Sequence, residues 1–278
     1  MTPVPDTCPA FVVSAESYDR LMGRYLPTLA PALADAAGIR GPARLLDVGA
    51  GPGGLTRELA HRAGADNITA IDPSPPFVAA CRERNPGVRV HQGVAEDLPF
   101  PDATFDATLA SLVVGFMDDP GRGLREMARV TRPAGTVAVC FWDLDRMPAL
   151  RIFWTAAARL DPDVTGEQHR PGAAPGELAT LLRQAGLHNV REDVLQAHAD
   201  YTDFDDWWNP YTLGVGPIGT YYNARTTAER IALRDECRRL LGRPAGRFTL
   251  HASCWFAAGN RIDINADHAV APRPVEPA

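Results

Sequence analysis

Lysine is missing from this sequence, and cysteine is scarce. All 28 basic residues among the 278 are arginine, which excludes catalysis through a lysine Schiff base. The five cysteines are widely spaced and form no C-x-x-C pair, so the sequence favours neither a disulfide framework nor a zinc site. We expect buried or incidental thiols and no bound metal; the five residues are Cys8, Cys81, Cys140, Cys237 and Cys254.

Long apolar runs and an excess of positive charge are also absent. No run approaches the roughly 18 uninterrupted apolar residues of a membrane span, and residues 1–10 lack the basic-then-apolar order of a signal peptide. The net charge of −6 gives no broad attraction to nucleic acid or to an anionic membrane. We therefore expect a cytoplasmic protein that binds neither nucleic acid nor membrane.

The most informative stretch is Arg44 to Thr56. A short apolar run that contains an acid, Leu45-Leu46-Asp47-Val48, is typical of a buried strand whose carboxyl end reaches a ligand. The alternating glycines Gly49, Gly51 and Gly53 follow, and glycine is favoured where the backbone turns sharply beside a ligand. A helical stretch over 55–62 completes a strand, turn and helix, which together predict a nucleotide-type binding corner.

The ligand of this corner is constrained by two acids and a proline. The spacing G-x-G-x-x-G, which begins at Gly49, is a weak sign of a dinucleotide. Asp47 would repel a phosphate, and Pro52 removes an N–H donor that a phosphate-binding loop needs. Asp72 ends the next apolar run, about 20 residues on, where a carboxylate that binds ribose hydroxyls is expected. The pattern favours S-adenosylmethionine, a cationic adenosine derivative, and leaves a dinucleotide-dependent oxidoreductase as a rival.

Four segments resemble a known family. Leu45-Leu46-Asp47-Val48-Gly49-Ala50-Gly51-Pro52-Gly53 is similar to motif I of the class I S-adenosylmethionine-dependent methyltransferases. The likeness continues over 93–100, 105–110 and 130–136, and it covers about residues 40 to 143. These segments resemble the small-molecule branch that includes the ubiquinone and menaquinone biosynthesis methyltransferases. The resemblance implies methyl transfer from S-adenosylmethionine, with S-adenosylhomocysteine as product, to a small-molecule acceptor.

Alternating apolar runs and helical stretches predict an α/β fold with a doubly wound, Rossmann-like, mostly parallel sheet. We expect a disordered segment over 1–13, a helical lid over 14–38, the cofactor-binding core over 39–143, a variable acceptor-binding region over 144–246, a final antiparallel strand over 247–260 and a disordered tail over 261–278. Strands are predicted over 44–48, 68–72, 88–92, 105–110, 136–141 and 189–196, and helices over 55–62, 76–85, 120–130 and 175–185. Residues 131–135 are predicted as a turn. Ser14 is expected to cap the first helix, and Thr226 with Glu229 a later one.

Cofactor-binding residues are expected where the strands end. In the resembling family the helices before the first strand close the pocket, which makes Tyr18 a lid residue and Arg24 a partner of the methionine carboxylate. The turn after the third strand holds the adenine there, and carbonyls after the fourth strand face the methionine ammonium. The candidates are Tyr18, Arg24, Asp47, Gly49, Ala50, Gly51, Gly53, Asp72, Pro73, Ala95, Glu96, Ala110 and Leu112.

Aromatic residues are dense in the variable region. Large apolar faces suit an apolar or aromatic acceptor, although they suit equally a small core of the insertion itself or a dimer contact. The protein is therefore expected to be a monomer or a homodimer. Candidate acceptor-binding residues are Phe116, Met117, Trp142, Trp207, Trp208, Tyr211, Tyr221 and Tyr222.

A general base is needed only if the acceptor is a weak nucleophile, since the enzyme otherwise aligns the acceptor with the methyl group. Asp143, His169 and His198 are the candidates, although the sequence favours a surface or hydrogen-bonded role for each of them. Two alternatives keep the same cofactor site: a cyclase or decarboxylase that uses the sulfonium as a fixed charge, and a non-catalytic cofactor sensor.

Overall fold

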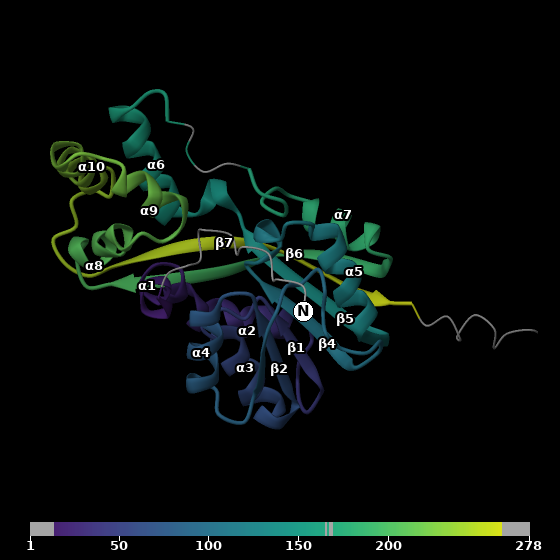
Figure 1. The fold of residues 1–278 in the computed structure, drawn as a ribbon. Coiled ribbons are helices and arrows are strands. Elements are labelled where there is room, and N and C mark those ends of the chain that lie inside the picture. The colour runs from purple at the N-terminus through teal and green to yellow at the C-terminus, as the bar shows by residue number, and fades with distance from the viewer. Residues whose placement is uncertain (1–13, 165, 167–168, 263–278) are drawn as a thin grey trace, which may run out of the picture.

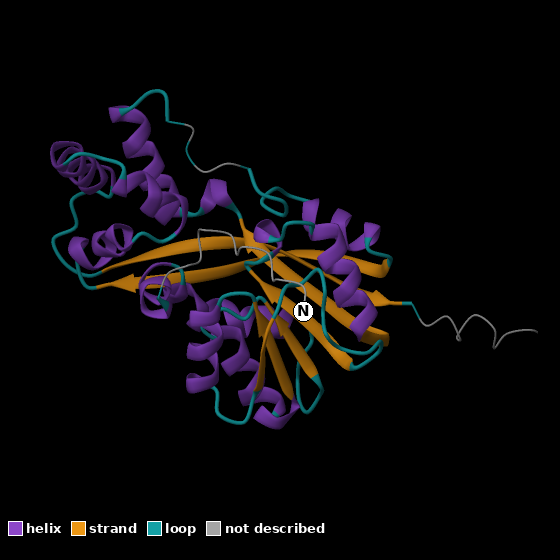
Figure 2. Ribbon diagram, in the orientation of Figure 1, coloured by secondary structure: helices purple, strands orange, loops and turns teal. Residues whose placement is uncertain are grey.

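The structure is a computed structural model that describes residues 14–164, 166 and 169–262. The segments expected to be disordered, residues 1–13 and nearly all of 261–278, lie outside the described residues. Within the described part the predicted doubly wound α/β fold is confirmed (Figures 1 and 2).

A seven-stranded sheet forms the centre of the molecule, in the order β3-β2-β1-β4-β5-β7-β6. The parallel strands are β1 (Leu45–Val48), β2 (Ile68–Asp72), β3 (Arg89–Gln92), β4 (Phe105–Ser111) and β5 (Thr131–Trp142). The last strand, β7 (Phe248–Arg261), is antiparallel, as predicted, and it lies between β5 and β6 (Leu187–Tyr201). The strand order reverses at β1 and β4, and in such sheets ligands bind at this switch point.

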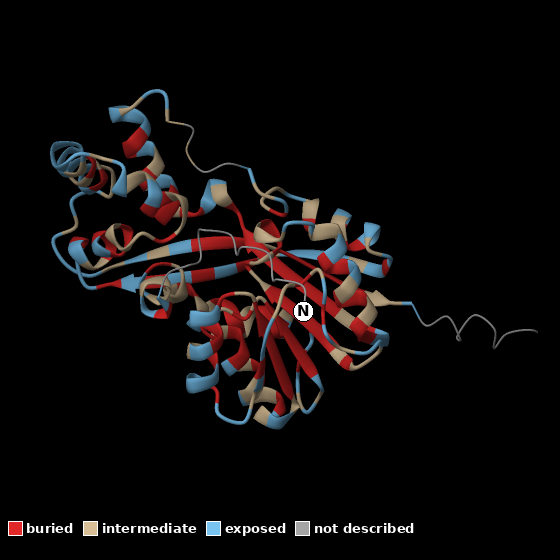
Figure 3. Cartoon of the chain, in the orientation of Figure 1, coloured by how far each residue is buried: buried red, intermediate tan, exposed pale blue. Residues whose placement is uncertain are grey.

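Helices cover both faces of the sheet. One face carries α2 (Leu26–Ala36), α3 (Gly54–Ala63) and α4 (Pro75–Arg84), and the other carries α5 (Pro120–Val130) and α7 (Glu177–Gln184). The buried residues are concentrated in the strands between these layers (Figure 3). Every residue of β1 and β2 is buried, as continuous apolar runs predict for strands that are covered on both faces.

The amino-terminal helices pack beside the carboxyl ends of the strands. Ser14 accepts a hydrogen bond from the N–H of Ser17 and so caps α1 (Ala15–Leu21), as predicted. A 3₁₀ turn, η2 (Gly23–Tyr25), then leads into α2, which has Pro27 in its first turn. Proline is tolerated there because the first N–H groups of a helix have no intrahelical partner.

The segment 131–135 differs from the prediction of a turn, because it forms the irregular start of β5. Thr131 pairs with Phe105, and the next pair joins Thr136 to Ala107, so extra residues bulge out of the ladder. Ala134 lies in this bulge at φ 60°. The Thr131 hydroxyl donates to the Met127 carbonyl at 2.7 Å, which ties the bulge to the end of α5.

The long strands β6 and β7 extend past the rest of the sheet and carry a helical lobe (Figure 1). This lobe contains α6 (Pro148–Leu160), α8 (Phe204–Trp208), α9 (Gly216–Asn223) and α10 (Thr227–Leu240), together with η6 (Asn209–Leu213). The predicted capping box of Thr226 and Glu229 opens α10. Across the described ranges, no helix combines the length and the apolar character that crossing a membrane requires.

Candidate functional site

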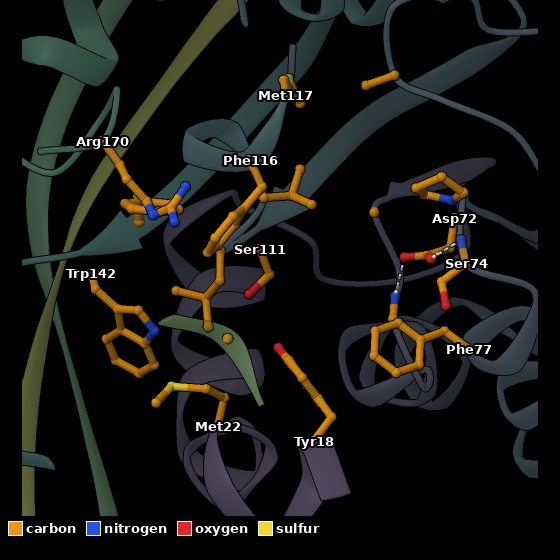
Figure 4. A pocket seen from close by; sticks show the side chains of 18 of the residues that line it. Tyr18, Met22, Asp72, Ser74, Phe77, Ser111, Phe116, Met117, Trp142 and Arg170 are labelled. Atoms are coloured by element: carbon orange, nitrogen blue, oxygen red, sulfur yellow. Dashed lines mark hydrogen bonds between the residues drawn. The ribbon is translucent and has the colours of Figure 1, made fainter. Parts of the chain in front are cut away.

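A cleft runs along the carboxyl ends of the five parallel strands (Figure 4). One end lies over β2 and β3 and the other over β5, and the turn after β1 lies between them.

The glycine turn after β1 presents bare main chain to the cleft. Gly49 and Gly51 have φ angles of 69° and 54°, which glycine adopts readily and other residues rarely do. A Cβ at Gly49 would lie 2.1 Å from Cγ2 of Val113, whereas a Cβ at Gly51 would meet no atom within 4 Å. Because Gly51 lines the cleft, this open space is where a ligand can lie against the backbone.

Asp72, at the end of β2, points its carboxylate into the same cleft (Figure 4). The N–H of Gly51 donates to Oδ2 at 2.8 Å, and the N–H of Ser74 donates to Oδ1 at 2.8 Å. Burial raises the pKa of Asp72 to about 6, although these two hydrogen bonds oppose the rise. Each oxygen keeps further acceptor capacity, so the fixed carboxylate can bind a pair of hydroxyls such as those of a ribose.

The turn after β3 forms the end wall beyond Asp72. Residues 93–96 line the cleft there, and Oε1 of Glu96 accepts a hydrogen bond from the N–H of Asp119 at 3.2 Å. Met117 lies at this end too, because a Cβ at Gly123 would come within 2.6 Å of its sulfur and 3.3 Å of the Ala95 Cβ. This end wall therefore combines main-chain and carboxylate groups with the apolar side chains of Ala95 and Met117, a mixture that suits a purine.

The exit of β4 lies between the two ends. Leu112 has a φ of 62°, and its N–H donates to the Cys140 carbonyl at 2.9 Å. A left-handed leucine is uncommon and is more frequent at functional sites. Leu112 lines the cleft, whereas Ala110 is fully buried and is not part of its lining. The hydroxyls of Ser111 and Tyr18 also point into this central part (Figure 4).

The end over β5 is mainly apolar. Phe116 packs against Phe141, with ring centroids 5.7 Å apart, and Trp142 lines the wall beside them. The first three residues of α9 and the one before it, 215–218, close this end from the helical lobe. Arg170, which lies between α6 and α7, places its guanidinium 4.3 Å from the centre of the Phe116 ring.

Comparisons with known proteins agree with this geometry. Residues 46–139 match a protein family described as a methyltransferase domain. The chain is 30% identical to the malonyl-[acyl-carrier protein] O-methyltransferase of Halorhodospira halophila, over 91% of this chain and 78% of that protein. The chain belongs to the class I S-adenosylmethionine-dependent methyltransferases.

Other relatives share smaller parts. The demethylmenaquinone methyltransferase of Chlorobaculum parvum is 33% identical over 39% of this chain and 44% of its own length. The solved structure of YcgJ from Bacillus subtilis has a TM-score of 0.53 at 19% identity and covers 84% of this chain and 98% of its own. A methyltransferase of Thermotoga maritima has a TM-score of 0.51 at 18% identity and covers 88% of this chain and 94% of its own. These two structures show the fold.

The cofactor of this methyltransferase is S-adenosylmethionine, as its family and the glycine turn predict. The cleft fits it, since the space beside Gly51 is open and the carboxylate of Asp72 faces that space. Eight of the thirteen residues predicted to bind the cofactor line the cleft: Tyr18, Gly49, Gly51, Asp72, Pro73, Ala95, Glu96 and Leu112. Their individual roles stay predictions.

Arg24 is a correction. It does not line the cleft, because its guanidinium forms an ion pair with Asp206 at the start of α8. Its Nη1 also donates to the Asp200 carbonyl at 3.2 Å, and the ion pair holds the pKa of Asp206 below its usual value. The arginine therefore attaches the amino-terminal helices to the helical lobe.

Asp47 is a second correction. It lies behind the glycine turn, 1% exposed, and Oδ2 accepts a 2.6 Å hydrogen bond from the Thr56 hydroxyl in α3. Burial raises its pKa to about 7, and the neighbouring Asp72 adds to the rise. Ala50 and Gly53 are also outside the lining; a Cβ at Gly53 would lie 2.2 Å from Nδ2 of Asn85. These residues shape the turn from behind.

None of the three predicted bases lines the cleft. Asp143 is buried, and its Oδ1 accepts a 3.2 Å hydrogen bond from the N–H of Arg146. The carboxylate thereby caps the 3₁₀ turn Leu144–Arg146. His169 pairs with Glu177 at 2.9 Å and is 63% exposed, and His198 is exposed beside His251. The structure thus supports the alternative reading of hydrogen-bonded or surface residues. In the described part of the chain no group of three or more His, Cys, Asp or Glu residues is arranged to hold a metal.

Most of the predicted acceptor aromatics pack on one another instead. Phe116, Met117 and Trp142 line the cleft, but Trp207, Trp208, Tyr211, Tyr221 and Tyr222 do not. Trp207 and Tyr211 lie with ring centroids 4.8 Å apart, and the Tyr211 hydroxyl donates to the Ala149 carbonyl at 3.1 Å. Phe153 of α6 contacts several of these rings. The cluster is the small core that the sequence left open as an alternative.

The lining includes residues that no pattern in the sequence selects. Arg170 stands in a stretch without helical or strand periodicity. The segment 215–218 was marked only by glycine and proline, which indicate a turn; Gly216 has a φ of 62°. Phe77 belongs to the predicted helix over 76–85, whereas Ser74 and Ser111 stand just outside the predicted elements, and only the path of the cleft selects these three residues.

Proposed function

We propose that this methyltransferase transfers the methyl group of S-adenosylmethionine to a small molecule with an apolar or aromatic body. The observation that carries the proposal is the difference between the two ends of the cleft. The end over β2 and β3 has carboxylates and main-chain groups, whereas the end over β5 is walled by Phe116, Phe141 and Trp142. Apolar lining with few polar groups is typical of sites for small organic ligands.

Four parts of the chain would hold the cofactor. Asp72 accepts hydrogen bonds from the ribose hydroxyls, the main chain of Gly51 lies under the adenosine, and the turn at Ala95 and Glu96 receives the adenine. The main chain at Leu112 faces the methionine ammonium. When bound, S-adenosylmethionine supplies a methyl group on a positively charged sulfur.

The residues of the chain align the acceptor with the methyl group and exclude water from the reacting atoms. Tyr18 and the residues beside it cover the central part of the cleft, and residues 215–218 cover the acceptor end. A bound acceptor is thereby held against the methyl group and away from water, and such alignment can replace several kcal/mol of activation free energy, roughly 7–11 in the most favourable reactions.

Relatives of this chain act on acceptors of different chemistry, a malonyl-[acyl-carrier protein] in one and demethylmenaquinone in another. Similarity to these relatives therefore allows methylation of oxygen, of nitrogen or of carbon. The walls of the cleft are the better guide to the acceptor.

A labelling experiment tests the proposal. The full chain is incubated with methyl-labelled S-adenosylmethionine and a panel of acceptors that differ in polarity, and label transfer and S-adenosylhomocysteine release are measured together. We expect equal amounts of both with an apolar acceptor. Cofactor consumption without label transfer would point instead to another use of the sulfonium, and transfer only to sugars or amino acids would refute the apolar acceptor.

A further inference from the structure

An aliphatic wall borders the acceptor end of the cleft, between α1 and the helical lobe. Three parts of the chain build it: the end of α1, the segment from the 3₁₀ turn after β5 to the first turn of α6, and the start of α9. The wall consists of Leu21, Met22, Leu144, Leu150, Val215 and Ile218. These residues pack in one apolar cluster with Trp142. Figure 4 shows Met22 and Trp142 at the end of the cleft that is remote from Asp72.

The helical lobe turns its aromatic side chains away from this wall. Val215 and Ile218 line the cleft at the start of α9. Tyr221 and Tyr222 of the same helix do not line it, because their rings pack in the aromatic core of the lobe. Although the lobe is rich in aromatic residues, none of the described lining residues that it contributes carries a ring. An acceptor thus meets aliphatic side chains on this side of the cleft, and rings on the side of β5.

The wall offers no hydrogen-bonding side chain to a ligand. The charged residues of the described lining all come from other elements: Asp72, Glu96, Asp118 and Arg170. Within the wall, Pro217 lacks an N–H, and the Val215 carbonyl already accepts a hydrogen bond from the N–H of Gly219 at 3.1 Å. A polar group that is buried without a partner is unfavourable. We therefore expect the part of an acceptor that lies here to be hydrocarbon.

We propose that the acceptor carries an aliphatic chain, which lies along this wall between α1 and α9. The reacting group then lies at the centre of the cleft, where the hydroxyls of Tyr18 and Ser111 point (Figure 4). This inference rests on the function proposed above, because it names the kind of apolar body. Burial of methylene groups is non-directional, and a methionine such as Met22 adapts to an irregular shape. An aromatic ring, in contrast, gains additional stability from contact with other rings, which this wall lacks.

A series of alcohols tests the inference without knowledge of the natural acceptor. The full chain is saturated with S-adenosylhomocysteine, and 1-hexanol, 1-octanol and 1-decanol are titrated by calorimetry. The ring probe is 2-phenylethanol, which has the same number of carbon atoms as 1-octanol and the same primary hydroxyl. We expect the affinity to rise about tenfold for each two methylene groups that are added to the chain, because the wall buries them.

Variants of Met22 show whether the wall binds the chain. Met22→Gln keeps the length of the side chain and adds a polar amide. It should weaken 1-decanol binding about fivefold or more, change 2-phenylethanol binding less than about twofold and leave S-adenosylhomocysteine binding unchanged. Met22→Trp fills the space instead and should weaken 1-decanol more than 1-hexanol. Because Met22 is half-buried, both variants should fold. Ile231→Gln, on the outer face of α10 where Ile231 is 58% exposed, is the matched control and should change none of these values.

Other outcomes overturn the inference. An affinity that does not rise with chain length, or no binding of 1-decanol, would show that the cleft holds no aliphatic chain. Tighter binding of 2-phenylethanol than of 1-octanol would assign a ring instead. Chain-dependent binding that both Met22 variants leave intact would place the chain outside this wall. In each of these cases label transfer to an apolar acceptor would persist, whereas failure of the proposed function would abolish it.

Discussion

Gly51→Val is the perturbation whose effect follows most directly from the structure. Gly51 has a φ of 54°, and a Cβ there would meet no protein atom within 4 Å. The left-handed backbone conformation therefore lowers the free energy of unfolding of the variant by about 2 kcal/mol for a branched residue, and the new side chain clashes with no protein atom. Against a stability of about 5–15 kcal/mol, it should fold, with a melting temperature lower by about 4–8 °C.

Cofactor binding should suffer far more than folding. The valine side chain would occupy the space where the adenosylmethionine has to lie against the main chain, so we expect calorimetry with S-adenosylhomocysteine to show at least about a hundredfold loss, which is about 2.8 kcal/mol.

Gly38→Val is the matched control for this variant. Gly38 is exposed, has a φ of 79° and also has no atom within 4 Å of a Cβ, but it lies after α2 and outside the cleft. It should show a similar fall in melting temperature and unchanged affinity. If Gly51→Val bound S-adenosylhomocysteine within about threefold of the parent protein, the assignment of the glycine turn would be refuted.

Three further substitutions separate the roles assigned above. Asp72→Ala should weaken S-adenosylhomocysteine binding by about 1–3 kcal/mol, because ribose hydroxyls lose a charged partner; unchanged calorimetric affinity would remove Asp72 from the site. Because the pKa of Asp72 is raised to about 6, its charged form predominates above that pH, so the parent affinity should be constant from pH 7 to 8 and fall below pH 6 by up to about tenfold per unit, a step that Asp72→Ala should lack. Arg24→Met should lower the free energy of unfolding by about 1–3 kcal/mol, since it leaves the half-buried Asp206 without its partner, and should leave cofactor affinity unchanged; a tenfold loss of affinity would return Arg24 to the cofactor. Tyr211→Phe should cost about 1 kcal/mol in denaturant unfolding, because the buried hydrogen bond to the Ala149 carbonyl is lost, and a change in acceptor selectivity instead would place Tyr211 in the acceptor site.

Most of the fold could be predicted from local patterns in the sequence. The strand over 68–72 and the helix over 120–130 have the predicted bounds, because apolar runs and a proline at the first helical turn act within a few residues. The capping box of Thr226 and Glu229 is equally local. The start of β5 was predicted as a turn because the bulge at 131–135 depends on pairing with β4, which a single segment does not reveal.

The cofactor end of the cleft was predictable for a similar reason. Gly49, Gly51 and Asp72 stand directly at strand ends, and in a parallel sheet those ends meet at one edge. Arg24 was misassigned because the partner that takes up its charge, Asp206, stands 182 residues away. An arginine near a predicted lid looks the same in sequence whether it faces a ligand or an ion pair.

The acceptor end was harder to predict. An aromatic residue such as Trp207 looks the same in the sequence whether it lines a pocket or packs in a core. Only the position of α6, whose Phe153 packs on the same cluster, shows that it packs in a core. Arg170 and the segment 215–218 reach the cleft from outside any periodic element. These residues can be identified as lining residues only from the three-dimensional path of the cleft.

A crystal structure of the full chain with S-adenosylhomocysteine tests the central claim most directly. We predict ribose hydroxyl oxygens about 2.6–3.0 Å from the carboxylate of Asp72, with the adenine against the turn at Ala95 and the thioether directed toward Phe116. Product bound elsewhere, or a cleft filled by the side chains of this chain so that no product enters, would contradict the account.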